Sequence, residues 1–274
     1  MVTRTPGLGY ASLRVFDLSL AEMLWSRRTI FMGLVVGLPV LLALVVRVLV
    51  DLGAPIRVQG GTAAGDQIFG LMMWVFFVRF AVPVLAVFYG TSLIADEVED
   101  KTITYLFSRP IPRGAVLLGK YLAYLACTVF VVLPAIVLVW LLVAPINGSL
   151  AATFPSLLTD LALVLLGLSV YGALFALFGT VLKRPLLAGL IYVFGWETFA
   201  LLMPGALKKV SIAYYMQGLV PHAMPGNSAV SLIQSIVRDI PTLTESLFYL
   251  GLILFICLWL ATRAIGRKEY VLEQ

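Results

Sequence analysis

Residues 96–120 read DEVEDKTITYLFSRPIPRGAVLLGK and form the longest strongly charged run in an otherwise very apolar chain. Of the 274 residues, 61% are hydrophobic and only 12% are charged. This composition excludes an ordinary soluble domain and is typical of an integral membrane protein. Because apolar stretches of membrane-spanning length flank the run on both sides, we expect it to lie at the membrane surface, where a partner outside the bilayer can contact it.

Six apolar stretches are long enough to cross a bilayer, since a spanning helix needs about 20 apolar residues. They are too long and too uniformly apolar for the alternating strands of a membrane barrel. The sequence therefore predicts an all-α membrane protein, a single transmembrane domain over residues 1–274 with six helices. The predicted spans are 29–50, 68–95, 117–143, 157–182, 186–203 and 246–265.

The distribution of basic residues predicts the orientation of these spans. With a cytoplasmic N-terminus, thirteen of the nineteen lysines and arginines fall in inner segments, as the positive-inside rule requires. We therefore expect a multi-pass inner (plasma) membrane protein with both termini and the loop 96–116 in the cytoplasm, and with segment 204–245 outside. The same asymmetry accounts for the net positive charge, so no nucleic-acid partner is expected.

The segment before the first span has apolar residues at helical spacing, which predicts an N-terminal amphipathic helix in the inner membrane interface. These residues are Leu13, Phe16, Leu20, Met23 and Leu24. The helix either anchors the first span or contacts a cytoplasmic partner, and the residues alone leave both interpretations open.

Two charged residues lie deep within predicted spans, where a lone charge is costly. Arg79 and Glu197 each lie about 11 residues from one end of a span, and Glu197 is interpreted as the only acidic residue at such depth. We hypothesise that the two side chains pair or share a polar cavity. The pair is interpreted either as a structural ion pair or as a substrate or proton site.

The charged run itself divides into two parts. Asp96, Glu97 and Glu99 predict the beginning of a short helix, since the helix dipole favours negative charge there. The segment from Arg109 to Arg113 then contains two prolines, which end a helix and turn the chain. An acidic helix followed by a proline turn predicts a rigid protrusion.

The order Glu97-x-Glu99-x-x-Thr102, then Leu106, Pro110, Arg113 and Leu117-Leu118-Gly119-Lys120 resembles the cytoplasmic loop of the membrane subunits of type-2 ABC exporters. The resemblance extends to the number of spans, the N-terminal helix and the cytoplasmic ends, so it covers essentially the whole chain. One departure is Lys101, where many relatives have glycine. The resemblance implies that the loop is a coupling helix, which faces an ATPase subunit and transmits its closure to the membrane helices. It assigns this coupling to Glu97, Glu99, Thr102, Leu106, Phe107, Arg109 and Arg113.

The chain contains no GxxxxGK[ST] phosphate loop, so we expect ATP and magnesium to bind in a separate partner, not here. The resemblance implies two copies of an ABC ATPase subunit, a second copy of this or a similar permease, and surrounding membrane lipid. No catalytic, cofactor or metal site is expected in this chain, which is therefore not expected to be an enzyme. The predicted function is that of the permease subunit of an ATP-driven exporter.

A short amphipathic helix is predicted in the outer segment. The resemblance implies that it lines or closes the outer gate, and the alternative interpretation is a surface helix resting on lipid. Its apolar residues are Val230, Ile233, Ile236 and Val237. Two alternative functions stay open. The subunit relays ATPase motion to an accessory protein on the outer side without moving a solute, or it is a proton-coupled secondary carrier. The substrate is not indicated by the sequence.

Overall fold

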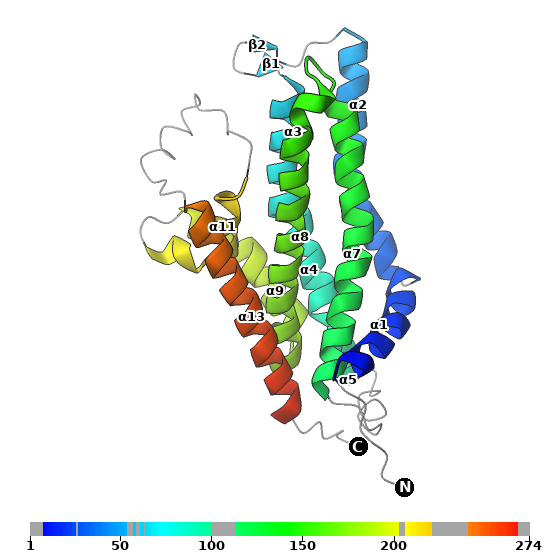
Figure 1. The fold of residues 1–274 in the computed structure, drawn as a ribbon, viewed down its shortest axis with the longest axis vertical. Coiled ribbons are helices and arrows are strands. Elements are labelled where there is room, and N and C mark those ends of the chain that lie inside the picture. Colours follow the sequence, from blue (N-terminus) through cyan, green and yellow to red (C-terminus); the bar gives the residue numbers. More distant parts are fainter. Residues whose placement is uncertain are drawn as a thin grey trace.

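The computed structural model describes residues 8–25, 27–53, 57–58, 61–62, 64–99, 113–202, 206–220 and 241–267. Within these ranges the protein is helical, apart from one antiparallel pair of two-residue strands. The helices form an elongated bundle (Figure 1). The elements are α1 (Leu8–Leu24), α2 (Arg27–Asp51), β1 (Arg57–Val58), β2 (Gly61–Thr62), α3 (Gly65–Met72), η1 (Met73–Ala81), α4 (Val82–Gly90), α5 (Ser92–Glu99), α7 (Arg113–Val143), α8 (Leu150–Val181), α9 (Pro185–Leu190), η2 (Ile191–Glu197), α10 (Thr198–Leu202), η3 (Ala206–Val210), α11 (Ile212–Gln217) and α13 (Leu243–Arg267).

Five helices in the described ranges are long and apolar enough to cross a membrane. They are Thr29–Asp51, Gly65–Ala95, Gly114–Val143, Leu150–Val181 and Leu243–Arg267, and they contain five of the six predicted spans almost entirely. The remaining predicted span, 186–203, corresponds to the shorter apolar helix Pro185–Ala200. An all-helical membrane fold is thus confirmed, whereas the sixth span stays a prediction.

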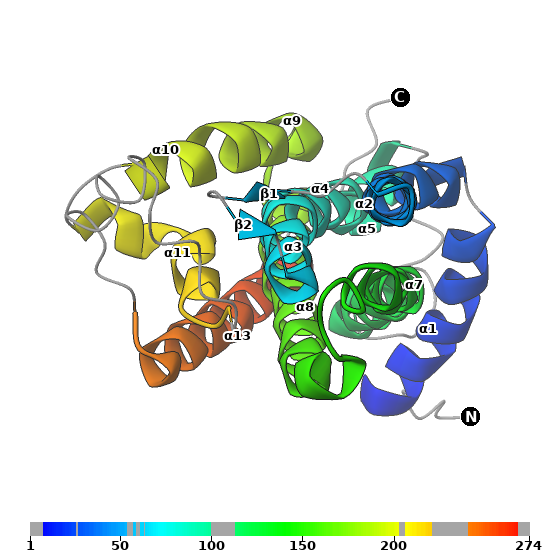
Figure 2. The same cartoon turned by 90° about the horizontal axis from the view of Figure 1, so that it is seen from above.

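Helices α7 and α8 are central to the described bundle. Helices α4 and α13 pack against α8, and α1 and α2 pack against α7. Seen from above (Figure 2), α7 and α1 lie to one side of α8, and α13, α11 and the α9–α10 segment lie to the other. Helix α1 packs along α7, while α2 contacts both α7 and η1. The described core is therefore a set of helix pairs arranged about α7 and α8.

Glycine and tyrosine residues set the spacing between α8 and its neighbours. Tyr124 of α7 is fully buried beside Gly172 and donates a hydrogen bond to the carbonyl oxygen of Leu168 at 2.9 Å. Tyr121, one turn earlier, donates to the carbonyl oxygen of Ser169 at 2.7 Å. In lipid, helices associate through close van der Waals packing and interhelical hydrogen bonds of this kind.

The second long helix contains a π-helical segment, η1, directly before Pro83. A proline has no N–H, so Pro83 cannot donate to the carbonyl oxygen of Arg79 four residues earlier. The backbone N–H of Val82 instead donates to Phe77, five residues back. Pro83 lies in the first turn of α4, which continues directly from η1.

The end of α8 also follows from its sequence. Leu182 is extended and Arg184, which precedes Pro185, is held out of the helical region, as expected for a residue before proline. Pro185 then begins α9. At the opposite end of α8, residues 144–149 form a turn in which Asn147 has a positive φ of 52°. In this turn, the carbonyl oxygen of Ile146 accepts a hydrogen bond from the backbone N–H of Gly65 at 2.7 Å. This contact fixes the start of α3.

We predict that Gly179→Ala destabilises the protein. A Cβ at this position would lie 2.5 Å from the carbonyl oxygen of Thr91, and a backbone atom cannot move aside as a side-chain tip can. Overpacking of this kind costs about 1–3 kcal/mol. Thermal unfolding of the detergent-solubilised protein measures the loss. Gly251→Ala is the control, because no atom lies within 4 Å of a Cβ placed there. Equal melting temperatures for the two variants would contradict the prediction.

Candidate functional site

The predicted coupling stretch lies only partly within the described residues. Glu97 and Glu99 belong to α5, and Arg113 is the first residue of α7. Thr102, Leu106, Phe107 and Arg109 lie outside the described residues. Helix α5 contacts α7, α8 and α9. The two helices that flank the coupling stretch, α5 before it and α7 after it, therefore lie together at one end of the bundle (Figure 1). The coupling role of these residues stays a prediction.

The structure corrects the predicted beginning of the acidic helix. Helix α5 already begins at Ser92, so Asp96, Glu97 and Glu99 are not in its first turn. The reason lies in the apolar residues before them, because Leu93 and Ile94 are each only 1% exposed. The helix therefore extends back into the protein, beyond the charges from which its start was predicted.

The first turn of α5 is closely tied to its neighbours. The Ser92 hydroxyl donates to the carbonyl oxygen of Tyr89 at 2.9 Å, and the Thr91 hydroxyl donates to that of Val87. Gly179 lets α8 approach the Thr91 carbonyl. The acidic end of α5 is therefore a direct extension of a segment held between α4 and α8, and sequence reasoning did not find Leu93, Ile94 or Gly179 as the residues that hold it.

Helix α1 packs against the first part of α7 through small residues. Ser12, Val15 and Ser19 are buried, and a Cβ at Gly119 would lie 2.6 Å from the Ser12 carbonyl oxygen. Of the residues predicted to form the apolar face, Leu13 is 59% exposed, as a helix in a membrane interface allows, whereas Leu20 and Met23 pack against the core. Close backbone approach at Gly119 therefore sets the face of α1 that packs on α7. The position of α1 relative to a membrane stays a prediction.

Glu197 is a buried charged residue whose two carboxylate oxygens each accept two hydrogen bonds. It is the last residue of η2 and is 4% exposed. Its Oε1 accepts hydrogen bonds from the Tyr192 hydroxyl at 2.9 Å and the Ile212 backbone N–H at 3.0 Å. Its Oε2 accepts from the Ser211 hydroxyl and the Ala213 backbone N–H, the latter at 3.1 Å.

This carboxylate therefore caps α11. The first N–H groups of any helix lack partners within the helix and carry partial positive charge, which a carboxylate satisfies and stabilises. The cap comes from an element 14 to 16 residues earlier in the chain. It joins η2 to α11, whose residues Ile212–Met216 are all buried.

Arg79 does not supply the partner of this carboxylate. No ion pair within 4.0 Å joins the two side chains, both of which the structure describes. Instead, Tyr171 of α8, which is 1% exposed, interacts electrostatically with both Arg79 and Glu197. Both charged residues also lie in π-helical segments, η1 and η2. Such segments are frequent at functional sites. Whether these two residues act in function stays untested.

Asp160 is a buried acid within a long apolar helix that the sequence analysis missed. It lies in α8 and is fully buried, so Glu197 is not the only acidic residue deep in a spanning helix. The predicted span began at residue 157, which placed Asp160 near its rim. The observed helix begins at Leu150, because the segment before residue 157 continues the helical turn in spite of Pro155. The sequence signal that could have identified Asp160 is a single aspartate within a long apolar run.

The predicted outer helix cannot be compared with the structure. Val230, Ile233, Ile236 and Val237 lie outside the described residues. The described part of the same segment, 206–220, contains η3 and α11. Met216 of α11 packs against Gly167 of α8, and α11 also contacts α13. Part of the predicted outer segment is therefore buried between helices.

No group of three histidine, cysteine, aspartate or glutamate side chains is suitably placed to hold a metal ion, as far as the described ranges extend. Cys127 and Cys257 are buried free thiols on separate helices.

A family model for ABC-2 family transporter proteins matches residues 15–268, which is almost the whole chain. The chain belongs to this family. It is therefore a membrane (permease) subunit of a type-2 ABC transporter, as the resemblance in the 96–120 run indicated. The matched range includes α5, Arg79, Glu197 and α11, so the features described above lie within the family domain. Comparison with curated proteins gave no match.

We predict that Glu197→Gln destabilises the first turn of α11 and exposes its backbone N–H groups to solvent. Glutamine retains one acceptor oxygen and places an NH₂ donor where the carboxylate accepted hydrogen bonds, so buried donors lose their partners. We expect a loss of about 2 kcal/mol or more and faster hydrogen exchange at the Ile212 and Ala213 amides, measured by mass spectrometry.

Two control variants distinguish the cap from other effects. Ser211→Ala removes one donor but leaves the carboxylate partnered, so we expect a cost of about 1 kcal/mol and little change at Ala213. Arg79→Gln is expected to leave exchange at Ile212 and Ala213 unchanged. If Arg79→Gln instead exposes these amides as strongly as Glu197→Gln does, the arginine and not the cap controls α11.

Proposed function

We propose that this ABC-2 permease subunit is the membrane component of an ATP-driven exporter and receives its energy at the α5 end. Two copies of the chain work with two copies of a separate ATPase subunit, which binds ATP and magnesium. Each copy crosses the bilayer six times, with both termini on the ATPase side. The observation that carries this proposal is the close attachment of α5 to α4 and α8.

This attachment gives a route by which force applied at the acidic part of α5 reaches the bundle. Leu93 and Ile94 are buried, and Gly179 brings α8 against Thr91 at the junction of α4 and α5. Protein interiors are close-packed and transmit displacement rather than absorbing it. A push on Glu97 and Glu99 therefore tilts α4 and α8 together with α5.

The arrangement of the chain ends supports the same placement of the ATPase. The start of α1, the start of α7 and the end of α13 lie at the α5 end of the molecule (Figure 1). Described basic residues also belong to helix ends there, as expected on the cytoplasmic side: Arg113 begins α7, Lys183 and Arg184 follow α8, and Arg267 ends α13. Helix α1, packed on α7, provides a second surface there that an ATPase subunit can contact.

We predict that Glu97→Lys combined with Glu99→Lys abolishes coupling. The reversed charges repel the contact surface on the ATPase that accepts the acidic helix. In reconstituted vesicles with the co-expressed ATPase, ATP hydrolysis should lose its dependence on the permease, while membrane insertion and melting temperature stay near those of the unchanged protein.

The matched control is Asp51→Lys combined with Asp66→Lys. These two exposed carboxylates lie near β1 and β2, at the opposite end of the molecule (Figure 1), and give the same change in net charge. We expect this control to retain permease-dependent hydrolysis. If the Glu97/Glu99 variant retains it equally, α5 does not receive the ATPase. Transport driven by a proton gradient without ATP would instead support the secondary carrier.

A further inference from the structure

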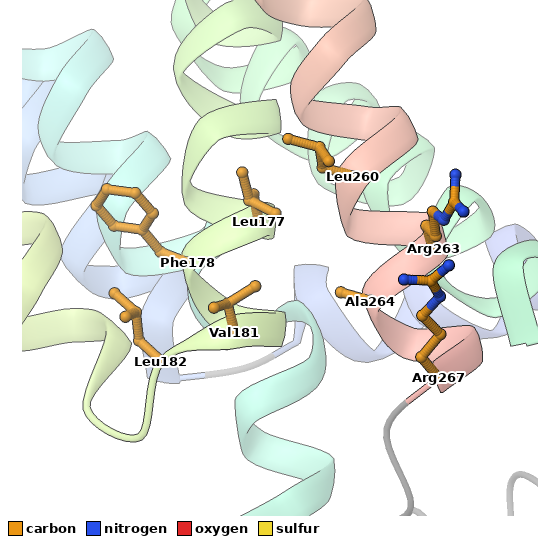
Figure 3. A pocket seen from close by; sticks show the side chains of 8 residues that line it. All are labelled: Leu177, Phe178, Val181, Leu182, Leu260, Arg263, Ala264 and Arg267. Carbon is orange, nitrogen blue, oxygen red and sulfur yellow. The ribbon is translucent and has the colours of Figure 1, made fainter.

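A groove lies between the final turns of α8 and α13, at the α5 end of the bundle (Figure 3). Its volume is about 430 Å³, within the size range of ligand pockets. Its apolar lining includes Leu177, Phe178 and Val181 from α8 and Leu260 from α13, while Ala264 points toward the α8 side chains. These helices are two of the five long enough to span the membrane.

Two arginines line the same groove. Arg263 and Arg267 are one turn apart on α13, and their guanidinium groups lie one above the other along the helix in Figure 3. Arg263 stacks over the ring of Trp259, 5.1 Å from its centroid. Stacking uses the face of the guanidinium and leaves its in-plane N–H donors directed outward. Neither arginine forms an ion pair with a carboxylate in the part of the chain that the structure describes.

Arginines in the last turns of a helix commonly stabilise the helix dipole and anchor the span. Neither role requires an apolar groove beside them. Here the groove extends from the guanidinium groups along the hydrophobic surfaces of two spanning helices. This combination of an apolar channel and two unpaired cations at its rim is complementary to an amphiphile with one anionic group.

We propose that this groove binds one anionic phospholipid of the leaflet that borders the α5 end, with an acyl chain between α8 and α13 and the phosphate between Arg263 and Arg267. The proposal depends on the membrane location of the chain but not on the ATPase coupling. An acyl chain leaves one apolar environment for another, so its burial alone gives little gain in affinity. Selectivity must therefore come from the charged head group, through arginine–phosphate hydrogen bonds.

The test uses the full chain purified in a neutral detergent and titrated with phosphatidylglycerol or phosphatidylcholine. Native mass spectrometry then counts the lipid molecules that the protein retains. We expect phosphatidylglycerol to be retained at lower concentration than phosphatidylcholine. Arg263→Gln and Arg267→Gln should each weaken its retention about fivefold, and the double variant roughly 25-fold.

The control is Lys183→Gln combined with Arg184→Gln. These exposed residues follow α8 at the same end of the molecule and are absent from the groove lining. They give the same loss of charge as the double arginine variant. Equal weakening by the two double variants would mean that general charge, and not the groove, attracts the lipid, and would overturn the proposal.

A second variant tests the apolar part while keeping both arginines. Ala264→Trp fills the groove and should abolish preferential retention of phosphatidylglycerol without lowering the melting temperature markedly. Competition by inorganic phosphate as effective as that by phosphatidylglycerol would show that the arginines bind an anion without the groove. That result would contradict the proposal. So would equal retention of the two lipids, or a second copy of the chain that covers the groove.

Discussion

The close approach of helix backbones to α8 is the constraint on which the bundle depends. A membrane provides no hydrophobic force between helices, so contact must come from shape and from hydrogen bonds. Gly172 admits the Tyr124 ring, and Gly179 admits the backbone at Thr91. Tyrosine hydroxyls then bond to α8 carbonyl oxygens. The same contacts that build the core also position α5, so stability and the proposed coupling share one set of residues.

The second requirement is that every buried charge has a partner inside the protein. Glu197 meets it without Arg79, through four donors: the hydroxyls of Tyr192 in η2 and Ser211, and two backbone N–H groups at the start of α11. A buried carboxylate with such donors is a fixed connector between two chain segments rather than a mobile charge. Helix α11 is only six residues long. A helix this short is marginal without tertiary support, and the carboxylate supplies part of that support.

Much of the fold followed from the sequence, because long apolar runs permit few alternatives to spanning helices. Five predicted spans agree with the structure, and the 96–120 run carried the family resemblance. Helix ends were less predictable: α5 begins earlier and α8 begins earlier than expected, since buried residues extend them. The Glu197 cap could not be predicted, because its donors are backbone groups whose position depends on tertiary packing. Nor could the face of α1 that packs on α7, which depends on the close backbone contact at Gly119.

The π-helical segment before Pro83 has a consequence for mapping this protein's surface. Each added residue in a wide turn rotates the following side chains by about 100° relative to a continuous α-helix. Positions on α3 and α4 that a helical wheel would place on one stripe therefore face different neighbours. Labelling or crosslinking positions in this span must be chosen separately on the two sides of η1, and an insertion or deletion there would turn one half of the span relative to the other.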